Sequence, residues 1–113
     1  MAEMALSPEL ETCIRECTNC HRVCLHMATG HCLQKGGAHA ASEHIRTMLV
    51  CAEICRTAAY VMITGATPHR QICAACSEIC KLCAQSCRGL NDMEMCIEAC
   101  DRCSTSCDAV TAI

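Results

Sequence analysis

The sequence has almost no aromatic residues: among its 113 residues there is no Phe, no Trp and a single Tyr, Tyr60. Although 52% of the residues count as hydrophobic, much of that share is Cys and Ala, and large aliphatic side chains are sparse. A core of Leu, Ile and Phe at normal packing density therefore cannot be assembled. Because the length predicts one domain, residues 1–113, something other than hydrocarbon must fill its centre.

Other absences exclude whole classes of function. The net charge is −3 with both signs interspersed, and no basic stripe predicts binding to nucleic acid. The first residues lack the features of a signal peptide, and no stretch approaches the roughly 18 apolar residues that cross a membrane. No constellation of catalytic groups is evident, so we expect no enzyme. These absences favour a cytoplasmic protein, whose thiols stay reduced.

The helix signals predict an all-α protein. Ser7 followed by Pro8 is typical of a helix start, Thr67 and Pro68 repeat the signal, and residues 91–94 resemble a capping box. Short connections place each helix antiparallel to the next, which predicts an up-down-up-down four-helix bundle. The expected helices are residues 8–30, 40–65, 68–89 and 91–111, with a loop or frayed helix over the glycine-containing residues 30–42.

Cysteine is the residue in excess, with sixteen in the chain. Along each expected helix the cysteines recur at steps of three and four residues, which places them on the seam that faces the bundle axis. Cys32 is the exception, because it lies one residue past the end of its series. The seam positions are Cys13, Cys17, Cys20, Cys24, Cys51, Cys55, Cys73, Cys76, Cys80, Cys83, Cys87, Cys96, Cys100, Cys103 and Cys107.

This arrangement favours metal binding over the alternatives. A single buried Cys packs as a small hydrophobe, but fifteen at successive core positions would make a thin, oxidisable core. Neighbours at i and i+4 on a helix have Cβ atoms about 5–6 Å apart, which is too far for a disulfide. One metal ion could bridge such a pair, so each C-x3-C pair is expected to hold one ion between adjacent helical turns.

The charge of the core selects the metal. Thiolates prefer Cu(I), Zn(II) or iron–sulfur clusters. Four thiolates on one Zn(II) carry a charge of −2, and a dry stack of such centres would be costly with no basic residue on the seams. One Cu(I) per thiolate is neutral, so we predict many Cu(I) ions per chain. An iron–sulfur or zinc protein with a redox or structural role is the alternative.

Softer and neutral donors gather at one end of the predicted bundle. Imidazole and thioether bind Cu(I) without losing a proton at neutral pH, so we expect this end to admit and release ions. His39 and Met95 lie nearby, His21 and His26 lie off the seam, and the opposite end carries Leu10, Met62, His69 and Val110. The candidate ligands at the first end are Met27, His31, His44, Met48 and Met93.

The motifs CIRECTNCHRVC, CAEIC, CAACSEICKLCAQSC and CIEACDRCSTSC, in that order, resemble the bacterial copper storage proteins in their cytosolic form. The resemblance spans nearly the whole chain, from Cys13 to Cys107. It implies a four-helix bundle that stores many Cu(I) ions through cysteine thiolates, without catalysis, and that assembles into a homotetramer. It also implies that the seam cysteines are the ligands, and we count Cys32 with them.

Overall fold

The computed structural model describes residues 6–112 and contains four long helices in an elongated bundle of 50 × 22 × 19 Å. No strand occurs in that range. The prediction of an all-α four-helix bundle is confirmed. Its elements are α1 (Pro8–Met27), η2 (Ala28–Cys32), α2 (Leu33–Lys35), η3 (Gly37–Ala40), α3 (Ser42–Thr64), α4 (His69–Arg88) and α5 (Glu94–Thr111).

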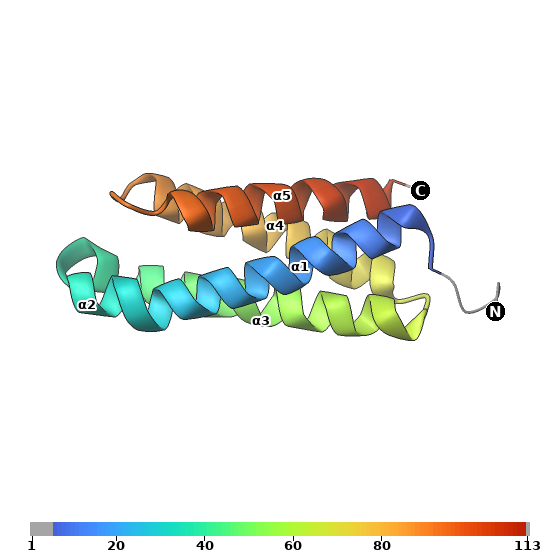
Figure 1. Cartoon of the computed structure of the whole chain (residues 1–113), viewed down its shortest axis with the longest axis horizontal. Helices are drawn as coiled ribbons and strands as arrows, with labels where there is room; N and C mark the ends of the chain where they lie inside the picture. Colours follow the sequence, from blue (N-terminus) through green and yellow to red (C-terminus); the bar gives the residue numbers. More distant parts are fainter. Residues whose placement is uncertain (1–5, 113) are drawn as a thin grey trace.

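The four long helices form a closed ring of neighbours. Helix α1 packs against α3 and α5, and α4 packs against the same two helices. Consecutive long helices run in opposite directions, so the start of α1 and the end of α5 lie at the same end of the bundle (Figure 1). Every long helix therefore turns one face toward a shared axis, as an up-down-up-down bundle requires.

The first helix begins as the sequence predicts, but two other start signals act differently. The Ser7 hydroxyl accepts a hydrogen bond from the Leu10 N–H at 3.2 Å, with Pro8 as the first helical residue. No side chain caps α4, which begins after Pro68. The predicted capping box at residues 91–94 is wrong, because α5 begins only at Glu94 and its N-terminus has no side-chain cap.

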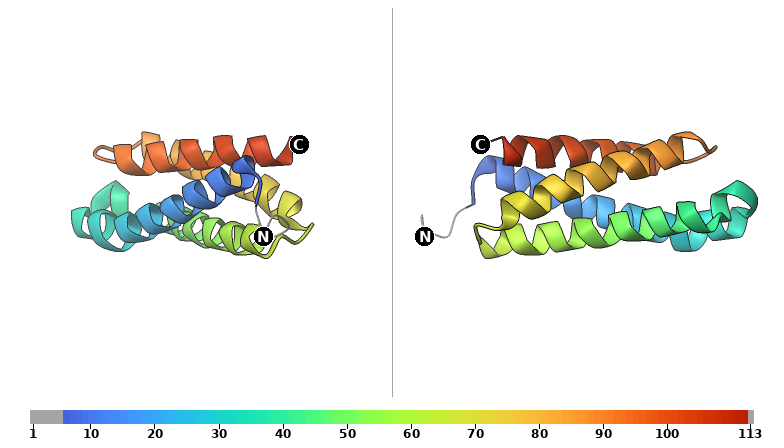
Figure 2. Two further views of the ribbon diagram at one scale, coloured as in Figure 1. Left: turned by 45° about the vertical axis from the view of Figure 1, so that its right-hand side comes forward. Right: turned by 180° about the vertical axis from the view of Figure 1, so that it is seen from behind.

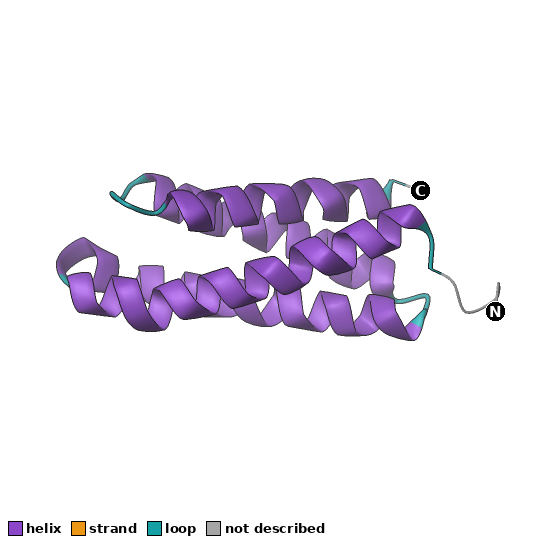
Figure 3. Ribbon diagram, in the orientation of Figure 1, coloured by secondary structure: helices purple, strands orange, loops and turns teal. Residues whose placement is uncertain are grey.

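The segment predicted as a loop or frayed helix over residues 30–42 is largely helical. The first helix continues through the wider π-helical turn η2 and the short α2 before the chain reverses (Figure 3). The reversal occurs at Gly36 and Gly37, whose φ angles of 72° and 56° suit glycine. A π turn holds one residue more than an α turn. Everything after η2 is thus rotated relative to the heptad pattern of α1.

The bundle interior is lined with sulfur. All sixteen cysteine side chains have an exposed fraction of 0%, and buried Ala and Met residues complete the core. Among the described residues no Asp, Glu, Lys or Arg side chain is buried. Partly buried aliphatic side chains such as Ile14, Val23 and Ile79 pack around this core. The few large aliphatic side chains of the sequence are therefore sufficient to shield a column of thiols from solvent.

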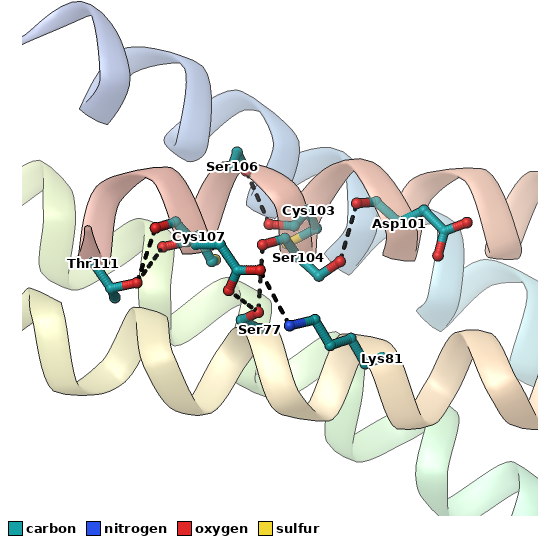
Figure 4. A network of polar contacts seen from close by, with 9 residues as sticks. Ser77, Lys81, Asp101, Cys103, Ser104, Ser106, Cys107 and Thr111 are labelled. Atoms are coloured by element: carbon teal, nitrogen blue, oxygen red, sulfur yellow. Dashed lines mark hydrogen bonds and ion pairs between the residues drawn. The ribbon is translucent and has the colours of Figure 1, made fainter. Parts of the chain in front are cut away.

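Polar contacts outside the thiols tie α4 to α5. Figure 4 shows Ser77 and Lys81 on α4 facing the last turns of α5. The Ser77 hydroxyl and the Lys81 ammonium group both donate to the Asp108 carboxylate. Ser106 and Thr111 instead donate to carbonyls of their own helix, at Cys103 and Cys107. Hydroxyl groups close to the core are thereby satisfied without reaching into it.

Helix α3 qualifies the expectation about membranes. It is the one helix of the described residues that is long and apolar enough to cross a bilayer, with a mean hydropathy of 1.3 over its best window. In this window 39% of the residues are buried in the bundle. A buried core helix passes the same test of length and composition, so the finding is weak evidence for a membrane span.

Candidate metal centre

The thiols form a continuous column along the bundle axis. Because all sixteen cysteines are free, their sulfur atoms are available as metal ligands. Within several groups the Sγ atoms all lie within 4.8 Å of one another, which is close enough for each group to hold a metal ion. The groups are Cys13/Cys73/Cys107, Cys17/Cys76/Cys103/Cys107, Cys20/Cys55/Cys80/Cys103 and Cys20/Cys24/Cys51/Cys100.

The sulfur–sulfur distances suit bridging metal ions. The Sγ atom of Cys55 lies 3.5 Å from that of Cys80 and 3.7 Å from that of Cys103, and other close pairs extend to 4.0 Å. Two metal–sulfur bonds of about 2.3 Å would span these gaps at angles between about 100° and 120°. A disulfide would need the sulfur atoms at about 2.05 Å. The column is thus spaced for three- or four-coordinate ions shared between thiolates.

The C-x3-C unit is less dominant than the sequence suggests. Close Sγ contacts within one helix occur at 13/17, 20/24 and 76/80, at 3.8–3.9 Å. Most other close pairs join two helices, as Cys20 and Cys100 do at 3.8 Å and Cys51 and Cys80 do at 3.8 Å. Ions held here would therefore crosslink the helices instead of sitting only between turns of one helix.

The environment keeps most thiols protonated before metal binds. Burial raises the pKa of the Cys32 thiol. Hydrogen bonds among neighbouring thiols raise the pKa of Cys100. Hydrogen bonds from neighbouring thiols instead lower the pKa of Cys87 to about 4, by way of Cys83 and Cys96. The same kind of contact lowers the pKa of four more thiols, which are Cys13, Cys20, Cys51 and Cys76. No Asp, Glu, Lys or Arg side chain is buried beside these thiols among the described residues.

One end of the column has a different donor set. The Cys32 Sγ atom lies 3.7 Å from His44 Nε2, 3.7 Å from Met48 Sδ and 3.7 Å from Met93 Sδ. We call these four residues the mouth cluster. They come from η2, α3 and the residue before α5, and their side chains are at most 6% exposed. Thiol, thioether and imidazole donors thus converge on one point.

His44 is held in a form that suits metal binding. Its Nδ1 shares a hydrogen bond of 2.7 Å with the Ser86 hydroxyl, while Nε2 faces the Cys32 sulfur. Burial lowers the pKa of His44, so the imidazole is neutral near pH 7. A partner on the second ring nitrogen orients a histidine ligand in metal sites. Ser86 therefore positions His44, a role that the sequence pattern does not reveal.

The residues that face the core after Cys24 differ from those that the sequence pattern predicts. The steps of three and four residues that follow Cys24 predict Met27 and His31 at the next core positions. The π turn instead brings Ala28 and Cys32 into the core, and Met27 and His31 are only half-buried. Met27 lines a surface groove of about 620 Å³ with His26 and Met95. Met27 thus packs against the edge of the core without being fully buried, and the role of Met27 and His31 as ligands stays a prediction.

His31 instead contacts His39 beside the mouth cluster. The two rings meet edge to face with their centroids 5.6 Å apart, and the buried Nε2 of His31 has no hydrogen-bond partner. His39 is 7% exposed, and its Nε2 shares a 2.7 Å hydrogen bond with the Asn91 carbonyl. The spacing of Cys24, Ala28 and Cys32 was the sequence signal for this rotation, because four-residue steps replace the mixed steps before them.

The opposite end of the column is closed by one thioether and by aliphatic side chains. Met62 is fully buried and Val110 is 3% exposed, while Leu10 is partly buried against the same core. His69 lies at the start of α4 and uses Nδ1 to bond the Ala66 carbonyl at 2.7 Å. The donors expected at the first end therefore have no equivalent cluster here among the described residues.

Comparison with known proteins agrees with this geometry. A family model described as copper storage protein matches residues 6–112. The chain belongs to the copper storage protein family. No curated protein matched the chain.

Solved structures of copper storage proteins and similar chains extend the match. The crystal structure of a protein from Nitrosospira multiformis is 42% identical, with a TM-score of 0.90, and the match covers 92% of this chain and 95% of that chain. The Cu(I)-bound copper storage protein BsCsp3 is 32% identical, with a TM-score of 0.83, over 91% of this chain and 98% of that chain.

Proposed function

We propose that this protein stores Cu(I) ions along its thiol column and performs no catalysis. The observation that carries the proposal is the burial of sixteen free thiols in one column that contains no charged side chain among the described residues. Family membership supports it, as does the Cu(I) bound by BsCsp3. The whole chain, residues 1–113, acts as one binding domain.

Charge balance favours Cu(I) over the alternatives. When Cu(I) binds a protonated thiol, the sulfur–metal bond replaces the S–H bond and one proton leaves, so the core keeps its charge. Four thiolates around each Zn(II) would add negative charge that nothing buried offsets. The ferredoxin pattern of an iron–sulfur protein, C-x2-C-x2-C-x3-C-P, needs its cysteines on a loop folded around the cluster. The cysteines here lie on helices, so this alternative is disfavoured.

We assign the ligands according to their place in the column. His44, Met48 and Met93 complete the mouth cluster around Cys32, and they exchange ions with the outside. His31 lies against His39, and Met27 lines the surface groove with Met95; both contact ions only in transit. The storage ligands are Cys13, Cys17, Cys20, Cys24, Cys32, Cys51, Cys55, Cys73, Cys76, Cys80, Cys83, Cys87, Cys96, Cys100, Cys103 and Cys107.

We further propose a cytoplasmic homotetramer that binds neither nucleic acid nor membranes. Sixteen free thiols suit a reducing compartment. The exposed apolar side chains Val50, Tyr60 and Ile63 on α3 and Leu82 on α4 are available for contacts between copies. Light scattering of the purified protein would measure the assembly, and a monomeric mass would exclude the tetramer.

Anaerobic titration of the reduced protein with Cu(I), beside a competing chelator, tests the proposal. Storage predicts a plateau near or above the number of thiols, with about one proton released for each ion bound by a thiol. A parallel titration with Zn(II) is the control, and it should saturate at far fewer ions. A Cu(I) plateau at only a few ions, or an iron-loaded protein on isolation, would exclude storage.

A further inference from the structure

The mouth cluster is closed to solvent in this structure. Cys32 and Met48 are 0% exposed, Met93 is 1% exposed and His44 is 6% exposed. An ion with its own ligands therefore cannot reach the cluster without a movement of the protein. The part that moves should be weakly packed, because local opening is cheapest where few apolar contacts are lost.

Residues 33–40 have this property. They comprise α2, Gly36 and η3, and they connect Cys32 to the start of α3 at the same end of the bundle as the α4–α5 connection (Figure 2). His39 is the only buried residue of the segment, while Leu33 is 51% exposed. We call residues 33–40 the lid. Little apolar surface holds it in place.

Two polar contacts fasten the lid to the loop between α4 and α5. The Lys35 ammonium group lies 2.7 Å from the Asp92 carboxylate, and His39 Nε2 lies 2.7 Å from the Asn91 carbonyl oxygen. The next residue in this loop is Met93, a member of the mouth cluster. The contacts thus join the lid directly to the loop that supplies one of the donors.

The lid also covers a donor that has no partner. His31 Nε2 is buried without a hydrogen bond, and its ring rests against the His39 ring. An unpaired buried nitrogen destabilises the closed state, because it has given up its bonds to water. When the lid lifts, this nitrogen regains access to solvent or to an arriving ion. The missing hydrogen bond of His31 therefore destabilises the closed lid, and opening restores a partner to this nitrogen.

We propose that residues 33–40 form a gate whose Lys35–Asp92 and His39–Asn91 contacts set the rate of access to the mouth cluster. This gate rests on the proposed storage function for its purpose but not for its motion. Lid opening changes how fast ions enter and leave, and it leaves unchanged how many the column holds. The ion pair is exposed to solvent, so its contribution is modest and weakens with ionic strength.

The first experiment needs no copper. Cys32 alkylation by iodoacetamide is followed by peptide mass spectrometry in the reduced protein and in its Asp92→Asn variant. Asn tolerates the left-handed backbone at this position, where φ is 59°, so the substitution removes the charge with little strain. We expect Cys32 to react about two- to fivefold faster. Cys13 and Cys73, at the other end, should react at unchanged rates.

Asp101→Asn is the matched control. It breaks the Arg88–Asp101 ion pair, which joins α4 and α5 and is about as exposed as Lys35–Asp92, without touching the lid. The Lys35→Met and His39→Leu pair of substitutions removes both lid contacts and should exceed the Asp92→Asn effect. Equal Cys32 alkylation in wild type, Asp92→Asn and the double variant, or equal acceleration by Asp101→Asn, would overturn the gate.

A copper experiment then separates the gate from storage. A chromogenic Cu(I) chelator should remove copper from the loaded Asp92→Asn variant about two- to fivefold faster than from wild type, at the same total capacity. Raising the ionic strength should accelerate removal from wild type more than from the variant. Faster alkylation of Cys32 with a low copper capacity would refute storage and keep the gate; unchanged removal rates at full capacity would refute the gate.

Discussion

The thiol column and the mouth cluster are both built on helices, but they differ in how regularly their donor residues are spaced. In the column, cysteines recur at regular steps, the close pairs of thiols lie 3.5–4.0 Å apart, and the donors are uniform. At the mouth, a π turn interrupts the pattern, and one thiol meets an imidazole and two thioethers. Regular spacing gives many equivalent sites, whereas the interruption gives one site unlike the rest.

The difference suggests a division of roles. A neutral thiol releases a proton when it binds Cu(I), while imidazole and thioether donors at neutral pH do not. Ions should therefore be held more strongly in the column and exchanged more readily at the mouth. Capacity would then depend on the column and exchange rates on the mouth, which substitutions in the two regions can separate.

The largest expected effect comes from replacing Cys20 and Cys103 with Ala, because each belongs to two of the thiol groups. We expect the double variant to lose about two or more Cu(I) ions per chain, while Cys32→Ala loses about one at most. Titration with Cu(I) under a competing chelator measures both. Equal losses in the two variants would show that the column and the mouth contribute alike.

A smaller effect is expected from a matched pair of methionines. Met48→Leu removes a thioether from the mouth cluster, and Met62→Leu makes the same near-isosteric change at the closed end. Only Met48→Leu should alter the rates of Cu(I) uptake and removal, by about threefold or more, with capacity changed by about one ion at most. Stopped-flow measurements with a chromogenic chelator compare the two, and similar rates would remove the distinction between the ends.

The smallest effect concerns the polar contacts between α4 and α5 on the outside of the bundle. The Ser77 hydroxyl, with help from Lys81, lowers the pKa of Asp108. A lowered pKa stabilises the fold above the ordinary Asp value, and this contribution is lost as the pH falls through the folded-state pKa. Because Asp108 is half exposed, Asp108→Asn should cost only about 0.5 kcal/mol at pH 7.

Urea unfolding of the metal-free Asp108→Asn variant and wild type, at neutral and at acidic pH, measures this contribution. The difference between the two should shrink toward zero in acid, where the wild-type carboxylate is protonated as well. Lys81→Met serves as the control that removes the ion pair and keeps the Ser77 hydrogen bond. A difference that grows in acid would contradict the assignment to Asp108.

Much of the fold and of the site was predictable because each rests on local patterns. The cap at Ser7, the glycine stop at Gly65 and the regular cysteine steps depend on neighbours within one helix, so they are visible in one dimension. For residues 30–42 the sequence could not choose between a loop and a frayed helix, and the capping box at residues 91–94 was wrong; the two cases have a common reason. Both segments lie at the mouth, where contacts between distant residues such as Lys35 and Asp92 decide the conformation.

The sequence by itself determined a helical bundle with a sulfur-lined axis, because the spacing of fifteen cysteines matches the helical repeat. The tertiary structure decided that Cys32 is fully buried in the core while Met27 and His31 are only half-buried. It also decided that the closest thiols lie mostly on different helices. The physical reason is that one added residue in a π turn rotates all that follows, and only packing against α3 and α5 shows which rotation buries the donors.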